Sequence, residues 1–170
     1  MGTPRKQRRK FARPKHPWQT ERIAEEKELC LKYGLNNRRE VWKAKSKLAR
    51  IRDQAKKLLA LKGEEAEKQR KELIAKLNIW GIKIKTLDDI LALDVTSLLG
   101  RRLQTVVFRK ALANTPKQAR QFITHNHVFV CNHKVSTPSY IVLAKEEDLV
   151  KLADDIQVEK GVTEKTSEEG

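Results

Sequence analysis

Residues 101–140 constrain the fold of this chain most, because the start of a helix can be placed there from the sequence. Thr115 is followed by Pro116 and, two residues further on, by Gln118, which is the capping-box pattern with proline at the first helical position. A helix is therefore predicted to begin at Pro116. At the helical period its apolar residues form one stripe, Ala119, Phe122 and Ile123, and its polar residues form the opposite face, Lys117, Arg120, Gln121 and Thr124. The first face is expected to pack and the second to meet phosphate groups.

A tight turn and a hairpin are predicted directly after this helix. Asn126 is suited to the left-handed conformation that stops a helix. Residues 127–131 alternate as a strand does, residues 132–133 are predicted to form a turn, and residues 134–135 a return strand. Residues 102–109 form another amphipathic helix before this unit. Two helices and a hairpin thus make one module, whose outer faces carry Arg, Lys, His and amide side chains.

The order and spacing of these motifs resemble the S-four RNA-binding domain family. The resemblance rests on five segments: residues 102–109 (RLQTVVFR), 118–123 (QARQFI), 125–128 (HNHV), 130–135 (VCNHKV) and 138–140 (PSY). Where the family usually has glycine, this chain has Asn126 in the helix stop and His133 in the hairpin turn. Asparagine accepts a positive φ, whereas histidine is less favourable in such a turn. The resemblance implies that the module binds RNA.

Two kinds of side chain in the module are candidates for RNA contact. The cations, which neutralise phosphates, are Arg101, Arg102, Arg109, Lys117, Arg120 and Lys134. The uncharged side chains, which can hydrogen-bond 2′-hydroxyls as well as phosphates, are Gln104, Gln118, Gln121, His125, His127, Ser139 and Tyr140. Two alternatives stay open, because the histidines can instead cap backbone groups at the turn and Tyr140 can pack internally. The shape of the RNA, more than its base sequence, is expected to be recognised.

The charge of the chain is unevenly distributed. The formal net charge is +15, and residues 146–170 contain nine acidic and three basic residues, so residues 1–145 carry +21. A solvated charged surface explains mixed charges but not such an excess. A field of this size attracts polyanions and holds them through counterion release. A nucleic-acid partner is therefore expected, with an acidic and flexible tail at the C-terminal end.

Residues 1–19 are predicted to form an extended basic arm that becomes ordered on RNA. They contain three prolines, no acidic residue and seven cations that are candidates for RNA contact: Arg5, Lys6, Arg8, Arg9, Lys10, Arg13 and Lys15. Trp18 has two interpretations, because it can stack on a base or pack onto the first helix as a hydrophobic staple.

Residues 20–100 are predicted to be helical. The first helix spans residues 20–33, and the second is opened by a capping box at residues 37–40 and broken near Gly63. The apolar stripe of this second helix is Val41, Leu48, Ile51, Ala55, Leu58 and Leu59. Its candidates for RNA contact are the cations Arg38, Arg39, Lys43, Lys47 and Arg50. The competing interpretation is that these cations only solvate the helix.

A charged helix over residues 64–77 and two short helices, which begin after Thr86 and Asp94, complete this region. Six apolar side chains of the short helices are expected to form a core that bridges the helical region to the RNA-binding module: Ile90, Leu91, Leu93, Val95, Leu98 and Leu99.

The order of elements over residues 3–145 resembles the ribosomal protein S-four family, in its archaeal and eukaryotic branch. The added likeness lies in residues 33–35 (YGL), residues 39–42 (REVW) and the helix at 87–93. The fold class is α+β, a mainly helical N-terminal domain with a basic arm plus a small module of two helices and a short antiparallel hairpin or sheet. The predicted parts are an arm at 1–19, a helical domain at 20–100, an S-four-type RNA-binding domain at 101–150 and an acidic tail at 151–170.

The resemblance implies a structural protein of the small, 30S-type ribosomal subunit in the cytoplasm. Such a protein binds 16S-type ribosomal RNA at a multi-helix junction of the five-prime domain and starts subunit assembly. The resemblance further implies ribosomal proteins S-three and S-five as neighbours, a place near the channel through which messenger RNA enters, and a role in translational accuracy. Two alternatives stay open: a non-ribosomal assembly factor of the small subunit, and the RNA-docking subunit of an rRNA-modifying enzyme.

Neither a catalytic centre nor a metal, cofactor or membrane is expected. Cys30 and Cys131 lie far apart without a CxxC spacing, and neither a GxSxG motif nor a GxxxxGK phosphate loop occurs. The apolar runs are shorter than the roughly 18 residues that indicate a membrane span. A binding protein is therefore favoured over an enzyme.

Overall fold

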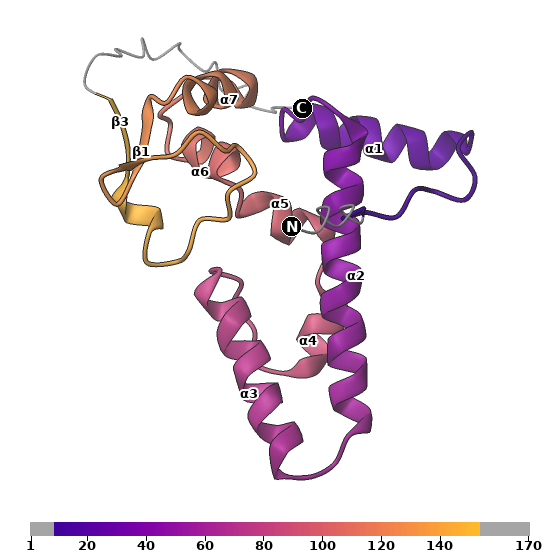
Figure 1. The fold of residues 1–170 in the computed structure, drawn as a ribbon. Helices are drawn as coiled ribbons and strands as arrows, with labels where there is room; N and C mark the ends of the chain where they lie inside the picture. Colours follow the sequence, from indigo (N-terminus) through magenta and orange to yellow (C-terminus); the bar gives the residue numbers. More distant parts are fainter. Residues whose placement is uncertain (1–8, 154–170) are drawn as a thin grey trace, which may run out of the picture.

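The computed structural model describes residues 9–153, which form a helical region (residues 20–100) and a C-terminal module (residues 101–152) (Figure 1). The predicted RNA contacts Arg5, Lys6 and Arg8 lie outside the described residues, as does the predicted acidic tail from residue 154 onward. Within the described part of the chain, seven α-helices accompany one small antiparallel sheet. This combination confirms the predicted α+β class.

The helical region is built around its longest helix. α1 (Thr20–Lys32) lies across the N-terminal end of α2 (Arg38–Ala60), and α3 (Glu64–Ile79) returns from the far end of α2 (Figure 1). The short helices α4 (Leu87–Ala92) and α5 (Val95–Gly100) lead from α3 to the C-terminal module. Because α2 contacts each of the other four helices, it is the central helix of the region.

The helix boundaries lie close to the predicted helix starts and stops. Gly34 ends the turn after α1 with φ 60°, and Gly63, with φ 122°, separates α2 from α3. Thr86 and Asp89 form a complete capping box at the start of α4, in which each side chain accepts a hydrogen bond from the other residue's backbone. At these positions glycine supplies the positive φ, and at the start of α4 two side chains supply the cap.

The capping box predicted at residues 37–40 is wrong in its side chains. Asn37 is the N-cap residue, but its side chain accepts no hydrogen bond from the helix, and its backbone carbonyl accepts from the Glu40 amide at 3.0 Å. The Glu40 carboxylate is instead bound by Arg102 and Arg120 of the C-terminal module. A long-range ion pair has therefore displaced a local cap.

The apolar stripe of α2 is confirmed at five of its six predicted positions. Val41, Leu48, Ile51, Ala55 and Leu58 are buried, whereas Leu59 is 44% exposed. The prediction for Leu59 is wrong because Leu58 already occupies the inward position of that turn, and the next residue lies about 100° further around the helix.

The C-terminal module packs two helices against a three-stranded sheet. α6 (Leu103–Arg109) and α7 (Pro116–Thr124) precede the strands β1 (Val128–Val130) and β2 (His133–Lys134). A short 3₁₀ helix then leads into β3 (Val150–Leu152), so the strand order is β2-β1-β3 with antiparallel pairing throughout. The third strand is not foreseen from the sequence, and it extends the ordered module past the boundary predicted at residue 150.

The helix stop before the sheet is confirmed, but the hairpin turn lies one residue earlier than predicted. Asn126 adopts φ 63°, as its position in the helix stop requires. Val130 pairs with His133, so the two turn residues are Cys131 (φ 49°) and Asn132 (φ 66°). Two positive φ values in a two-residue loop fit the twist of the flanking strands. Shifting the turn puts His133 into the strand, where its ordinary φ is allowed.

Two separate apolar clusters support the two regions. The first joins α2 to α3, α4 and α5, and the second lies between α6, α7 and the sheet. The six side chains expected to bridge the regions all belong to the first cluster, and Leu91 and Leu93 are only partly buried in it. The predicted bridging core is therefore wrong, because polar side chains make the junction between the two regions.

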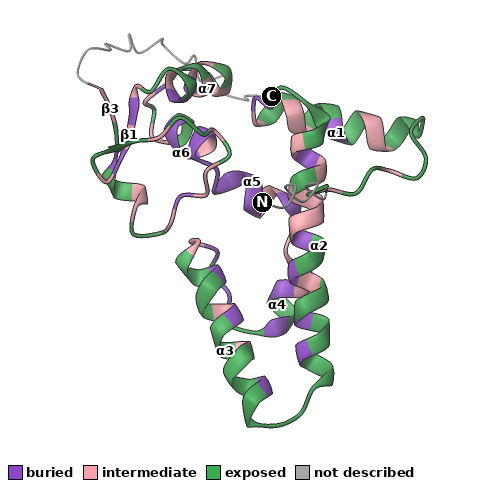
Figure 2. Cartoon of the chain, in the orientation of Figure 1, coloured by how far each residue is buried: buried purple, intermediate pink, exposed green. Residues whose placement is uncertain are grey.

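Buried residues are concentrated in the packed centre of the molecule, and exposed residues lie at its edges. Figure 2 shows buried residues in α5 and on the inner sides of α2 and α6, with exposed residues along most of α1 and α3. Among residues 9–153, no helix is long and apolar enough to cross a membrane.

Candidate nucleic-acid interface

Cations from both regions meet around a hollow beside α2. Its volume is about 430 Å³, and it is lined by the outer face of α2, by α5 and by residues 138–141 of the C-terminal module. Arg39, Lys43 and Lys47 of α2 contribute to this lining, as does Arg120 of α7. Arg39 and Lys43 are exposed, so their charges face solvent where the two regions approach each other. This placement agrees with the predicted phosphate-binding side of α2.

A second hollow, of about 350 Å³, lies where the arm meets α1 and α2. Four arginines line it together with Trp42, namely Arg13, Arg22, Arg38 and Arg39. Arg39 borders both hollows, so the two basic surfaces are continuous around the start of α2. The described cations of the arm, Arg9, Lys10, Arg13 and Lys15, are all exposed.

The base of the arm is held by a buried carboxylate that the sequence analysis did not identify. Glu26 of α1 is 1% exposed and accepts hydrogen bonds from Arg22 and from the Trp42 indole, each at 2.9 Å. Arg22 also donates to the carbonyls of His16 and Pro17, at 3.0 and 2.9 Å. The spacing of Arg22 and Glu26, four residues apart on one helix, is the sequence signal that could have revealed this pair.

Aromatic residues of the arm divide between packing and exposure. The Phe11 ring lies 6.0 Å from that of Trp42, and the Ala12 amide donates to Ser46 of α2 at 3.0 Å. Trp18, by contrast, is 88% exposed. The interpretation of Trp18 as a hydrophobic staple is therefore wrong, and its indole ring is accessible for stacking.

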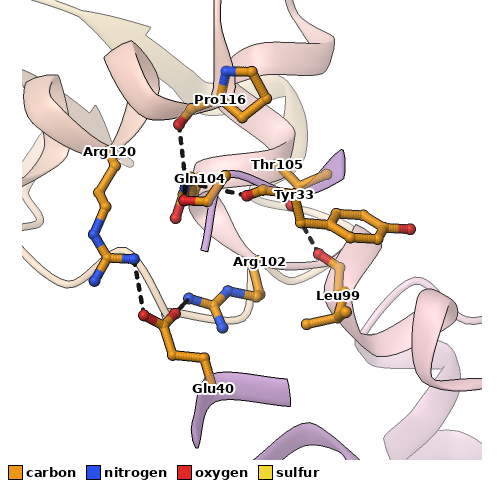
Figure 3. Close-up of polar contacts among 9 residues, drawn as sticks. Tyr33, Glu40, Leu99, Arg102, Gln104, Thr105, Pro116 and Arg120 are labelled. Atoms are coloured by element: carbon orange, nitrogen blue, oxygen red, sulfur yellow. Dashed lines mark hydrogen bonds and ion pairs between the residues drawn. The ribbon is translucent and has the colours of Figure 1, made fainter. Parts of the chain in front are cut away.

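A polar interface holds the helical region and the C-terminal module together, as Figure 3 shows. Glu40 of α2 pairs with Arg102 through one carboxylate oxygen and with Arg120, at 3.0 Å, through the other. The side chains of Arg102, Glu40 and Arg120 are 9%, 16% and 22% exposed. Removing one partner from such a shielded network leaves the others without compensation. Arg102 is therefore occupied inside the protein and is not part of an open RNA-binding surface.

Gln104 forms the second half of the polar interface. This residue is fully buried, and its side-chain amide donates to the carbonyls of Tyr33, Gly34 and Pro116, at 3.2, 2.9 and 2.8 Å (Figure 3). A Cβ at Gly34 would lie 2.7 Å from the Cβ of Pro116, so only glycine permits this close approach. The Gln104 side chain thus binds backbone carbonyls of both regions. Because it is buried there, it is not one of the side chains available to RNA.

Arg101 is likewise occupied within the fold. Its guanidinium donates to Glu147 at 2.6 Å and to the Val142 carbonyl at 3.1 Å, and the residue is 8% exposed. Gly81, at φ 76°, makes room for this guanidinium, since a Cβ there would lie 2.6 Å from its central carbon. The structure therefore removes Arg101 from the predicted RNA contacts, because burial and protein partners occupy its donors.

The outer face of α7 keeps the predicted exposure at three of its four positions. Lys117, Gln121 and Thr124 are exposed, whereas Arg120 is half-buried and paired with Glu40. On the inner face, Ala119 and Ile123 are buried and Phe122 is half-buried. Thr115 accepts from the Gln118 amide at 3.1 Å, as predicted, but the Gln118 side chain accepts from the Asn114 amide and not from the N-cap residue. Gln118 is therefore a local structural residue, whereas Lys117 and Gln121 remain available to a ligand.

The remaining candidates of the module differ in accessibility. His125, Lys134 and Ser139 are exposed and His127 is half-buried, with the two imidazole rings 6.3 Å apart. Arg109 is exposed too, although it donates to the Gly100 carbonyl at 3.3 Å.

Tyr140 packs within the module. Its ring lies against the second apolar cluster, and its hydroxyl donates to Glu146 at 2.9 Å. Burial and this hydrogen bond raise the pKa of Tyr140. Of the two interpretations of Tyr140, the structure supports internal packing.

Lys47 and Arg50 of α2 also differ in how accessible their charges are. The Lys47 ammonium lies 4.0 Å from the centre of the Trp80 ring, a cation–π distance, while Arg50 is exposed. Burial lowers the pKa of Lys47, and the nearby charge of Lys76 lowers it further. Lys47 thus borders the first hollow with a partly shielded charge.

Metal binding has no structural support in the part of the chain described here. Within residues 9–153, no group of three His, Cys, Asp or Glu side chains is close enough to hold an ion. Cys30 and Cys131 are both free thiols. The chemistry that the described surface offers is therefore cationic and hydrogen-bonding.

Comparisons with known proteins agree with this surface. Residues 101–149 match the family described as the S4 domain. The chain is 50% identical to small ribosomal subunit protein uS4 of Methanococcus aeolicus over 153 residues, which cover 88% of this chain and 86% of the relative. The corresponding protein of Saccharolobus solfataricus is 49% identical over 88% of this chain and 84% of its own length. That of Ignicoccus hospitalis is 47% identical over 90% and 93%. The sequence resemblance to the archaeal branch is thereby confirmed, and the chain belongs to the small ribosomal subunit protein uS4 family.

Proposed function

We propose that this chain is a structural protein of the small ribosomal subunit that binds small-subunit ribosomal RNA with both of its regions at once. The observation that carries the proposal is the hollow lined by the exposed cations Arg39 and Lys43 of α2 together with the exposed Ser139 of the C-terminal module. Exposed cations and hydrogen-bonding groups from two regions on one surface can hold RNA helices that converge there. The exposed side chains beside it add donors and acceptors for 2′-hydroxyls: Gln121 and His125.

The family supports a structural role. The chain belongs to a family of ribosomal proteins and carries an S4 RNA-binding domain, so it is not an enzyme. In this proposal it acts in cytoplasmic ribosomes and binds early in assembly of the subunit. The finer placement at a junction of the five-prime domain, beside S-three and S-five and near the channel through which messenger RNA enters, rests on the family resemblance, as does a contribution to translational accuracy.

Equilibrium binding of the full chain tests the proposal. A transcript of the junction from the five-prime domain of an archaeal small-subunit rRNA is compared with an unrelated duplex of the same length, over a series of salt concentrations. Tighter binding to the junction at every salt concentration is expected, because shape adds to charge. Equal affinity for the two RNAs would overturn the proposal. Sedimentation then separates a ribosomal protein, which migrates with translating ribosomes, from an assembly factor, which leaves before they form.

A further inference from the structure

The first hollow is larger and more varied than a phosphate site needs to be. Its volume of about 430 Å³ falls within the range of roughly 300 to 1,000 Å³ that is typical of small-molecule sites. Part of its lining is apolar: Ala44 of α2 and Pro138 and Ile141 of the module are half-buried, while Leu98 and Leu99 of α5 are buried. Phosphate oxygens gain nothing from such side chains, because burying a charge against apolar groups is unfavourable. The lining therefore points to a ligand with an apolar part.

The rest of the lining is cationic, and its one carboxylate is neutralised. Both oxygens of Glu40 are bound by arginines, so Glu40 does not present an open negative charge to an incoming phosphate. Arg39 and Lys43 stand exposed on the α2 side. A ligand with an apolar face and an adjacent anionic group meets both kinds of lining at once.

A polar side chain of the C-terminal module completes the lining. The Ser139 hydroxyl is exposed and can exchange hydrogen bonds with a base edge or a 2′-hydroxyl. The hollow therefore offers apolar, cationic and hydrogen-bonding groups together.

From these three features we infer that the hollow binds a single unstacked nucleotide of the bound RNA. The base lies against the apolar lining, and its flanking phosphates lie on Arg39 and Lys43. Unpaired nucleotides at bulges and junctions can leave the stack at small energetic cost, and proteins read them through apolar contact and edge hydrogen bonds. The inference rests on the proposed function, since it needs the chain to bind structured RNA, and it names the element of that RNA which this hollow takes.

Filling the hollow without changing its charge tests the inference. Ala44→Leu adds bulk to the apolar lining, and Ala75→Leu makes the same change at an exposed position of α3 as the matched control. Affinity of each full-length variant is measured for the five-prime-domain transcript. Ala44→Leu is expected to weaken binding about tenfold, as the loss of one base contact does, and Ala75→Leu is expected to leave it unchanged. Equal affinity of the two variants would overturn the inference.

A second blocking variant guards against misfolding. Ala44 is half-buried, so thermal unfolding is recorded for both alanine variants. Ser139→Leu narrows the hollow from an exposed loop position, where a larger side chain need not disturb packing. If Ala44→Leu melts early, Ser139→Leu is compared with Ser139→Ala, which removes the hydroxyl without adding bulk. Binding weaker than that of Ser139→Ala at an unchanged melting temperature supports the nucleotide site, and binding equal to it rejects the site.

An abasic substitution in the RNA then identifies what enters the hollow. Chemical probing of 2′-hydroxyl reactivity locates the nucleotide whose mobility differs between complexes of the wild-type and Ala44→Leu chains. Removing the base of that nucleotide should weaken binding to the wild-type chain and leave binding to Ala44→Leu unaffected. Additive losses, or no loss with wild type, would mean that only phosphates are held there. Failure of the proposed function itself is seen separately, as a wild-type chain that does not distinguish junction from duplex.

Discussion

Arg102 at the start of α6 and Arg39 in the first turn of α2 both line the hollow between the two regions, but their surroundings differ. Arg102 is 8% exposed and paired with Glu40, whereas Arg39 is exposed. The same division separates Arg101 and Gln104, which are buried among protein partners, from Lys43 and Lys117, which face solvent. Basic and amide residues that look alike in the sequence therefore have two different roles in this chain: some join the two regions, and others are available to a ligand.

The difference has an energetic reason. The two apolar clusters end on either side of the junction, so the relative placement of the regions depends on a few directional polar contacts. Such contacts specify geometry more sharply than apolar packing, and an RNA-binding surface made of two regions needs that geometry to be fixed before binding. We therefore expect variants of the polar interface to lose stability and variants of the exposed surface to lose RNA affinity.

Glu40→Ala should have the largest effect. The change leaves Arg102 and Arg120 close together without their shared carboxylate, which should lower the free energy of unfolding by about 3 kcal/mol, at the lower end of the range for a broken buried ion pair. Urea unfolding measures this loss as a shift of the midpoint. Glu25→Ala, at an exposed position of α1, is the matched control and should leave the midpoint unchanged.

RNA binding of Glu40→Ala separates an effect on stability from an effect on affinity. Because the change removes a negative charge from the lining of a basic hollow, the folded fraction of Glu40→Ala should bind RNA no more weakly than wild type at low salt. A midpoint equal to that of Glu25→Ala would contradict the role of Glu40 at the polar interface.

Gln104→Met should have the next largest effect. Methionine keeps the length of the side chain but removes the donors that serve three backbone carbonyls, so a loss of about 1 to 3 kcal/mol is expected. Gln121→Met, on the exposed face of α7, makes the same replacement without a buried acceptor and should unfold like wild type. Equal midpoints for the two variants would show that the Gln104 amide does not join the regions.

Local features of this fold could be predicted from sequence because they depend on neighbouring residues. Helix starts at Pro116 and after Thr86, and the stops at Gly34, Gly63 and Asn126, follow from proline, caps and positive φ. The inward stripe of α2 follows from helical periodicity in the same way.

Long-range polar partners could not be predicted in that way. Glu40 fits a local capping box in the sequence, and only the folded chain brings it to arginines 62 and 80 positions away. β3 escaped prediction for a related reason, since its three residues pair with β1 across a long intervening loop. The sequence therefore predicts too many RNA contacts at residues 101–104, because side chains of the types that bind RNA there stabilise the fold instead.

Arg39→Ala and Lys43→Ala should weaken RNA binding while leaving stability unchanged. Both side chains are exposed, so no packing is lost when they are shortened. If each contacts one phosphate, the dependence of log affinity on log salt should become shallower by about 0.7 to 0.9 per variant. Lys71→Ala, at an exposed position of α3 away from the hollow, is the control. An equal salt slope for all three variants would remove α2 from the RNA-binding surface.

Tyr140→Phe should have the smallest effect, and it separates packing from RNA contact at one residue. The hydroxyl donates to Glu146, so its removal should cost about 1 kcal/mol of stability without changing RNA affinity. Loss of affinity at unchanged stability would instead assign the hydroxyl to the RNA.

The pH dependence of stability gives an independent test of Tyr140. Burial, and then the hydrogen bond to Glu146, raise the pKa of Tyr140 above its ordinary value of 10.0. A raised pKa in the folded state means that the neutral phenol contributes stability in full below about pH 10, and that this contribution is lost as pH rises through the folded-state value. Unfolding measured from pH 8 upward should therefore show a steeper alkaline decline for wild type than for Tyr140→Phe. Identical declines would place the phenol in an environment like that of the unfolded chain, against its packing within the module.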